Sequence, residues 1–147
     1  RSLEQAPQNL LPRIMEVACG MRDELKVFGT DYDTRDGTCI RDYVHVTDLA
    51  IAHVKALDYI AKNDKSITVN LGTEKGTTVK ELIEASRRIT KKAIPAVDTE
   101  RRPGDPACLY ATSAFAKKEL DWEPKYSDVD TLVETTWKVY MPKIEEA

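Results

Sequence analysis

Two arginine-containing segments carry the side chains whose chemistry can be named from residue type alone. Arg41 follows a glycine turn, and Arg102 lies in a second, distant run that also holds a Pro-Gly pair. A guanidinium presents a planar fork of donors that matches phosphate oxygens two at a time. Two such groups brought together would clamp a diphosphate. The alternative is a pair of structural ion pairs with Asp42 and Asp105, because Arg–Asp pairs are common on protein surfaces.

Three other residues could contact a nucleotide. Phe28 could lay its ring against a flat base while backbone groups at Lys26 read the edge of that base, although an aromatic residue at a strand end also serves as a core anchor. Asn9 precedes an apolar helix, which is typical of an N-cap. A helix N-terminus also favours a phosphate, so Asn9 could serve in both ways.

No catalytic residue or metal site is expected in this chain. His45 lies in an apolar alternating segment, where a structural histidine is the simpler interpretation. Cys39 and Cys108 have no evident activating partner. His45 and His53 have no Cys or Glu at the spacing of metal ligands.

Composition excludes several classes of protein. The chain has 147 residues and a net charge of −3, which disfavours nucleic acid as a partner. No apolar run approaches the roughly 20 residues that cross a bilayer. Three cysteines without close spacing favour reduced thiols in the cytoplasm. The first residue is Arg, so we expect a piece of a longer protein.

The elements that must position these residues form a mixed α/β pattern. Strands are predicted at 26–28, 43–46, 67–71 and 94–97, and the apolar edges of the second and third would need a larger sheet to pair with. Helices are predicted from Asn9 to Gly20, after Thr47, after the capping box Thr78-Val79-Lys80-Glu81, from Ser113 to Leu120, and over the stripe Val129, Leu132, Val133, Trp137 and Tyr140. The buried stripe expected after Thr47 is Leu49, Ala50, His53, Val54, Leu57 and Ile60.

Five motifs in order resemble the UDP-glucose 4-epimerase family, in the extended short-chain dehydrogenase/reductase group. They are Val27-Phe28-Gly29-x-Asp31-Tyr32-x-Thr34-x-Asp36-Gly37-Thr38, Arg41-Asp42-Tyr43-x-His45-Val46-x-Asp48-Leu49-Ala50, Asn70-Leu71-Gly72, Arg101-Arg102-Pro103-Gly104-Asp105 and Glu119-Leu120-x-Trp122. The resemblance implies that residues 1–147 are the carboxy-terminal substrate-binding domain of a Rossmann-type α/β fold whose dinucleotide-binding core is missing. Strands of this chain would complete that missing domain.

The same resemblance implies UDP-sugar binding by nine residues. Asn9 and Leu10 would contact the diphosphate and neighbouring groups, Lys26 and Phe28 would flank the uracil, and Arg41 and Arg102 would hold the diphosphate. Asp105 would bond the ribose, Val79 would line the nucleotide pocket, and Leu109 would set the size of the sugar pocket. Glu74 stands where many relatives carry Gly, which would strain the backbone if that turn needs a positive φ.

The implied activity is the NAD-dependent interconversion of UDP-glucose and UDP-galactose, in galactose metabolism, by a homodimer. The family's Gly-rich dinucleotide loop (GxxGxxG) and its catalytic Tyr-x-x-x-Lys pair are both missing from this sequence. We therefore expect NAD to bind mainly to an upstream domain, and the isolated chain to be inactive. Two alternatives stay open: a fragment of another nucleotide-sugar dehydratase or decarboxylase, and a non-catalytic UDP-binding fragment.

Overall fold

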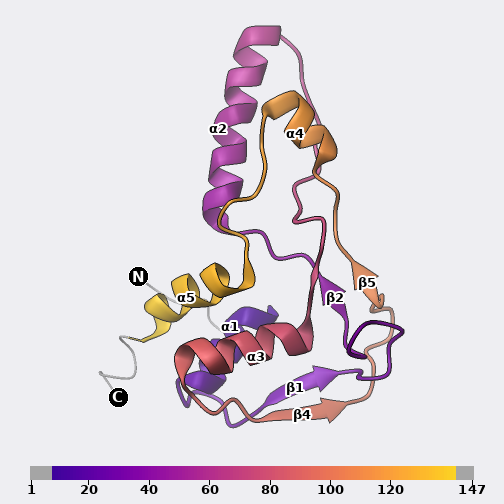
Figure 1. Cartoon of the computed structure of the whole chain (residues 1–147), viewed down its shortest axis with the longest axis vertical. Coiled ribbons are helices and arrows are strands. Elements are labelled where there is room, and N and C mark those ends of the chain that lie inside the picture. Colours follow the sequence, from indigo (N-terminus) through magenta and orange to yellow (C-terminus); the bar gives the residue numbers. More distant parts are fainter. Residues whose placement is uncertain (1–7, 142–147) are drawn as a thin grey trace.

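Five helices and five short strands make up the part of the chain that the computed structural model describes, residues 8–141. The helices are α1 (Leu10–Ala18), α2 (Val46–Asn63), α3 (Val79–Thr90), α4 (Ala114–Leu120) and α5 (Val129–Tyr140). The strands are β1 (Leu25–Phe28), β2 (Ile40–Arg41), β3 (Thr77–Thr78), β4 (Ala96–Thr99) and β5 (Cys108–Leu109). The predicted α/β class is confirmed. Figure 1 shows a body built from α1, α3, α5 and the strands, and an arm of α2 and α4 that rises from it.

The body owes its stability to apolar faces of three helices. α3 packs against both α5 and α1, and β1 pairs in parallel with β4, with Lys26 opposite Val97. Between them lies the larger core cluster, which includes Leu11, Ile14, Met15, Leu25, Val27, Leu82, Ile83, Ile94, Val133 and Trp137. A second sheet holds β2 between β3, which runs antiparallel, and β5, which runs parallel. This second sheet fixes Arg41 beside the helix that follows β3.

Several local predictions are confirmed, because short-range chemistry decides them. Thr78 and Glu81 form the predicted capping box at the start of α3. α1 begins after Asn9, buries the predicted apolar face and is followed by Gly20 at a φ of 75°. The predicted stripe of α5 packs into the core, and Trp122 is buried behind α4. Glu74 has a φ of 65°, so the turn does place a non-glycine residue in the left-handed region.

The prediction of a strand at 43–46 is wrong. Pairing occurs earlier, at Ile40–Arg41, and α2 already begins at Val46. The helix starts there because His45, and not Thr47, is its N-cap: the His45 ring accepts a hydrogen bond from the Thr47 backbone N–H at 3.0 Å. The fourth strand, predicted at 94–97, is formed instead by Ala96–Thr99, which pairs in parallel with β1.

The buried stripe predicted for α2 is also wrong for most of its members. Val54, Leu57 and Ile60 are 60%, 67% and 46% exposed. α4 covers only one side of α2, where Ala52 joins Trp122 in a small second core. Residues 67–71 run along this core without pairing as a strand. Among the described residues no neighbouring strand offers them a ladder of hydrogen bonds.

Candidate functional site

One cavity gathers eight of the nine residues singled out from the sequence. Its volume is 420 Å³, within the range of small-molecule sites. It is lined by Asn9, Leu10, Lys26, Phe28, Arg41, Val79, Arg102 and Asp105, together with further residues from the same elements. Leu109 is the exception. It lies on β5, paired in register with Arg41, and it is 60% exposed outside this cavity.

The start of α1 and all four residues of β1 line the cavity. In a strand, residues two apart share a face. Leu25 and Val27 face the core, so Lys26 and Phe28 project from the opposite face of β1. Asn9 occupies the N-cap position of α1, yet its side chain makes no capping hydrogen bond. The positive end of the α1 dipole therefore meets the cavity at Asn9 and Leu10.

Arg41 is held firmly on the other side. Its Nη1 donates to the carbonyl oxygens of Ile40 at 2.9 Å and Pro106 at 2.8 Å, and its Nη2 lies 3.5 Å from Asp105 Oδ1. Of the two carboxylates named from the sequence as ion-pair partners of the arginines, Asp105 thus pairs with Arg41. Asp42 is engaged elsewhere, since its carboxylate accepts from the Thr73 hydroxyl at 2.6 Å and from backbone N–H groups. Arg41 thus keeps a fixed position with donors at the cavity.

Arg102 reaches the same cavity from the connection between β4 and β5. Its guanidinium carbon lies 3.7 Å from the centroid of the Phe28 ring, which is cation–π geometry. Its neighbour Arg101 points elsewhere, toward Asp31, with an Nε–Oδ1 distance of 2.8 Å. The two arginines expected to share a ligand therefore border one hollow.

The cavity is electropositive. Four basic side chains line it, Arg13, Lys26, Arg41 and Arg102, against the acidic Asp42 and Asp105. The Asp42 charge is largely satisfied by backbone N–H donors, as described above. Basic groups around a hollow with low-dielectric walls concentrate anions there. The arrangement therefore favours a negatively charged ligand.

Among the lining residues that were not named as site residues from the sequence, Arg13 and Tyr43 add polar groups suited to a ligand. Arg13 adds a third guanidinium from α1, and Tyr43 lies two residues beyond Arg41. Burial raises the pKa of Tyr43 to about 12, so the phenol keeps its proton even in mildly alkaline solution. Arg13 could have been found from helical spacing: it lies four residues after Asn9, and residues i and i+4 share one face of a helix.

His45 and the cysteines, which were considered from the sequence as possible catalytic residues, show no catalytic arrangement in the part of the chain that the structure describes. His45 caps α2, and its Nε2 lies 3.0 Å from the Thr135 hydroxyl. Cys39 and Cys108 are free thiols, the first buried and the second exposed. Over residues 8–141, no cluster of three or more His, Cys, Asp or Glu side chains could hold a metal ion. In the same range, no helix has both the length and the hydropathy needed to cross a membrane.

Several known UDP-glucose 4-epimerases are similar in sequence to this chain. The enzyme of Rhizobium meliloti (strain 1021) is 49% identical over 127 residues, which cover 86% of this chain and 38% of the relative. The enzyme of Halalkalibacterium halodurans is 47% identical over 135 residues, covering 91% of this chain and 40% of the relative. The chain thus spans about two fifths of the length of these relatives.

The fold is similar to that of UDP-glucose 4-epimerases with known crystal structures. UDP-glucose 4-epimerase from Stenotrophomonas maltophila, with bound NAD and formylated UDP-arabinopyranose, superposes with a TM-score of 0.94 at 41% identity and covers 99% of this chain and 44% of its own. A family sequence model described as GDP-mannose 4,6 dehydratase matches residues 1–136. These matches confirm the resemblance to UDP-glucose 4-epimerases that was drawn from the motifs. The chain belongs to the family described as GDP-mannose 4,6 dehydratase, and the relatives described above are UDP-glucose 4-epimerases.

Proposed function

We propose that this chain is the UDP-sugar-binding part of a UDP-glucose 4-epimerase, which interconverts UDP-glucose and UDP-galactose. The observation that carries the proposal is the meeting of Arg41 and Arg102, from separate segments, at one cavity beside Phe28. The crystal structure with formylated UDP-arabinopyranose supports a UDP-sugar as the class of ligand. Sequence identity of 49% to an epimerase supports the reaction.

In this proposal the cavity holds the UDP part and leaves the sugar free to turn. Arg41 and Arg102 neutralise the diphosphate, with the first amides of α1 at Asn9 and Leu10 adding to them. Lys26 and Phe28 flank the uracil, and Val79 lines the nucleotide pocket. Asp105 bonds the ribose, and Leu109 limits the sugar pocket from outside the nucleotide cavity. Binding energy from the non-reacting UDP thereby positions the hexose.

NAD is the proposed cofactor of the complete enzyme, in which it takes up and returns a hydride. The residues present here do not fit it. A dinucleotide pyrophosphate needs a glycine-rich turn between a strand and a helix, and the strand–helix junction at Thr78–Val79 is instead filled by a threonine cap and its carboxylate partners. We therefore assign NAD to another part of a longer protein. The isolated chain is expected to bind UDP without turnover.

The exposed face of α2 is the proposed contact with that other part. Val54, Leu57 and Ile60 leave an apolar surface in contact with solvent, and segment 67–71 offers backbone groups that are not paired as a strand. In our interpretation, residues 1–147 are a substrate-binding domain whose segment 67–71 extends the Rossmann sheet of the longer protein. That protein is proposed to be a cytoplasmic homodimer.

Calorimetric titration of the chain with UDP and with uridine tests the binding proposal. Arg102→Ala removes one charge-assisted contact to the diphosphate, so UDP affinity is expected to fall about 10- to 100-fold while uridine affinity changes little. Arg101→Ala is the matched control, because it removes the same charge from the neighbouring position, where the side chain points to Asp31. It should change UDP affinity less than about threefold. Equal UDP affinity in Arg102→Ala and wild type would refute the clamp.

The reaction is tested with a longer protein that joins this chain to an NAD-binding domain. Epimerisation conserves the mass of the UDP-sugar, so UDP-galactose should yield UDP-glucose of equal mass. The family description names a dehydratase, which makes loss of water from a nucleotide-sugar the second candidate reaction. A product lighter by water, or by carbon dioxide, would replace the epimerase by a dehydratase or a decarboxylase. Binding without any turnover would leave a UDP-binding protein.

A further inference from the structure

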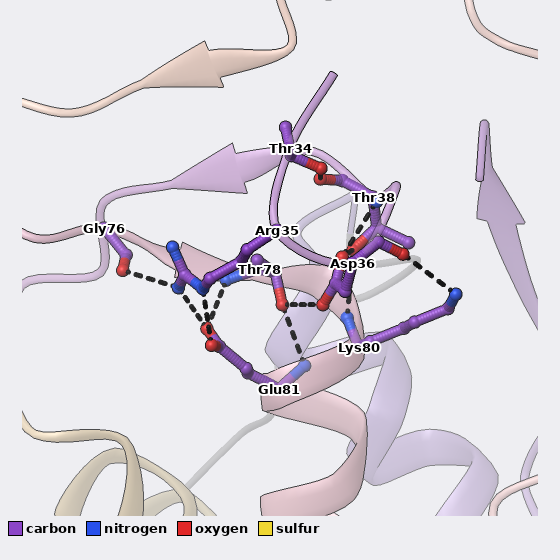
Figure 2. Close-up of polar contacts among 8 residues, drawn as sticks. All are labelled: Thr34, Arg35, Asp36, Thr38, Gly76, Thr78, Lys80 and Glu81. Carbon is purple, nitrogen blue, oxygen red and sulfur yellow. Dashed lines mark hydrogen bonds and ion pairs between the residues drawn. The ribbon is translucent and has the colours of Figure 1, made fainter. Parts of the chain in front are cut away.

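The loop at residues 29–39 is tied to the start of α3 by a network of polar side chains, shown in Figure 2. Asp36 Oδ1 accepts hydrogen bonds from the Thr38 backbone N–H at 2.9 Å and from the Thr38 hydroxyl at 2.7 Å. Its other oxygen, Oδ2, accepts from the hydroxyl of Thr78, the N-cap of α3. One carboxylate therefore joins the loop to the helix cap.

A second connection runs beside the first. Arg35 makes a two-pronged contact with the Glu81 carboxylate, with an Nε–Oε1 distance of 2.6 Å, and also donates to the Gly76 carbonyl oxygen at 3.2 Å. Glu81 is the capping-box residue that receives the Thr78 backbone N–H at 2.9 Å. Lys80 Nζ donates to the Asp36 carbonyl oxygen at 3.0 Å. Residues of the loop and residues of the first turn of α3 thus bind one another through several hydrogen bonds and one ion pair.

The network lies behind the wall of the cavity. Thr38 and Thr78 are fully buried, and neither they nor Asp36 lines the 420 Å³ hollow. Cys39 and Val79, the residues that directly follow Thr38 and Thr78, do line it, and so does Arg41 of β2, two residues beyond Cys39. The Val79 backbone N–H donates to the Cys39 carbonyl oxygen at 3.1 Å, and Arg41 pairs with Thr77 in the sheet. The contact between Asp36 and Thr78 therefore lies directly beside the backbone bonds that join β2 to the start of α3.

We propose that Asp36 is a positioning residue for the diphosphate site: it holds β2 on the N-cap of α3, so that Arg41 and Val79 face the same ligand. This inference rests on the proposed binding of UDP. It assigns to the Asp-Gly-Thr motif a part in ligand binding without contact to the ligand. Buried hydroxyls that lose their acceptor are costly, so the loop shifts when the carboxylate is changed.

Asp36→Asn tests the positioning role. An asparagine keeps one oxygen for Thr38 but turns an amide N–H toward Thr78, whose hydroxyl then has no carboxylate to donate to. We expect UDP affinity to fall about tenfold and uridine affinity to fall less than about threefold, because uridine lacks the diphosphate that Arg41 holds. Asp33→Asn is the control, since Asp33 lies exposed in the same loop and carries the same charge. It should bind UDP as wild type does.

A purely structural role would give another pattern. If Asp36→Asn only lowered the folded fraction, UDP and uridine binding would fall together, and that result would overturn the proposal. Arg35→Gln is a second variant, because the half-exposed Arg35 side chain can be replaced without burying a polar group. It is expected to weaken UDP binding in the same direction, by about threefold. UDP binding equal to wild type in both variants would also overturn the proposal.

Hydrogen exchange at the Val79 amide separates this inference from the proposed function. The amide is bonded to Cys39, so it should exchange faster in Asp36→Asn than in Asp33→Asn, with or without nucleotide. Equal exchange rates at Val79 in the two variants would refute the positioning role of Asp36, even if the wild-type chain binds UDP. A wild-type chain that does not bind UDP would refute the ligand, and with it the positioning role, whatever the exchange rates are.

Discussion

A single buried carboxylate fastens α2 to the chain that leads into α5, and its replacement gives the sharpest test of the fold. Asp48 is fully buried. Oδ1 accepts from the Lys125 backbone N–H at 3.0 Å, and Oδ2 accepts from the Tyr126 backbone N–H at 2.9 Å and the Ser127 hydroxyl at 2.6 Å. Both oxygens are thus surrounded by donors, and each donor needs an acceptor at this buried position.

Asp48→Asn replaces one of those oxygens by an amide that itself donates. Hydrogen bonds to a charged acceptor contribute about 1.5–3 kcal/mol each, and a buried donor left without its partner costs about 1–3 kcal/mol. If the remaining oxygen keeps the hydrogen bond from the Lys125 N–H, the new amide group faces two donors, the Tyr126 N–H and the Ser127 hydroxyl. Because such terms do not add fully, we expect the free energy of unfolding to fall by about 3 kcal/mol.

Urea denaturation at neutral pH, followed by tryptophan fluorescence, measures this change. Trp122 is a suitable reporter, because its indole Nε1 donates to the Asp48 carbonyl oxygen at 2.9 Å. Asp58→Asn is the control: it removes the same charge from an exposed position of α2 and should change stability by less than about 0.5 kcal/mol. Similar unfolding midpoints and slopes for the two variants would refute the reasoning.

Three further outcomes are expected. Gly37 and Gly104 share a φ of 83°, but a Cβ at Gly37 would meet the Thr30 carbonyl oxygen at 2.2 Å, whereas at Gly104 nothing lies within 4 Å. Gly104→Ala should therefore lose only about 1 kcal/mol on chemical denaturation, and Gly37→Ala at least about 1 kcal/mol more. Burial opposes ionisation of Asp36, but hydrogen bonds from two threonines outweigh it and lower its pKa below 3.8. Its contribution to stability is then complete above the unfolded pKa and lost as pH falls through the lower folded value, so Asp36→Asn should flatten the loss of stability below about pH 4, measured by thermal unfolding. Leu57→Lys on the exposed face of α2 should leave the unfolding free energy of this chain within about 0.5 kcal/mol, and a larger loss would mean that the face is covered.

Sequence reasoning found the parts of the fold that local chemistry decides. The capping box at Thr78 and Glu81 sets the start of α3, and the apolar spacing of α1 and α5 sets which faces they bury. Each of these depends on residues within one or two turns, so the pattern suffices. The two arginine motifs could likewise be singled out, because the guanidinium itself determines what it can bind.

The errors arose where an element depends on what lies beside it. The apolar spacing of α2 predicts a buried stripe, yet Val54 and Leu57 are exposed because α4 covers the other side of the helix. The alternation of 67–71 predicts a strand, but a strand also needs a partner, and sequence alone does not reveal whether one is present.

The sequence by itself determined the chemistry of the site: two guanidinium groups, an aromatic ring and a helix start, each identifiable by residue type and neighbours. Tertiary structure alone decided that they share one cavity, that Arg102 lies over Phe28, and that Arg41 is held by the Pro106 carbonyl and Asp105. The physical reason is distance along the chain. Contacts between remote segments depend on how β2, β3 and β5 pair and on the packing of α1 against α3, and no local pattern of residues specifies those arrangements.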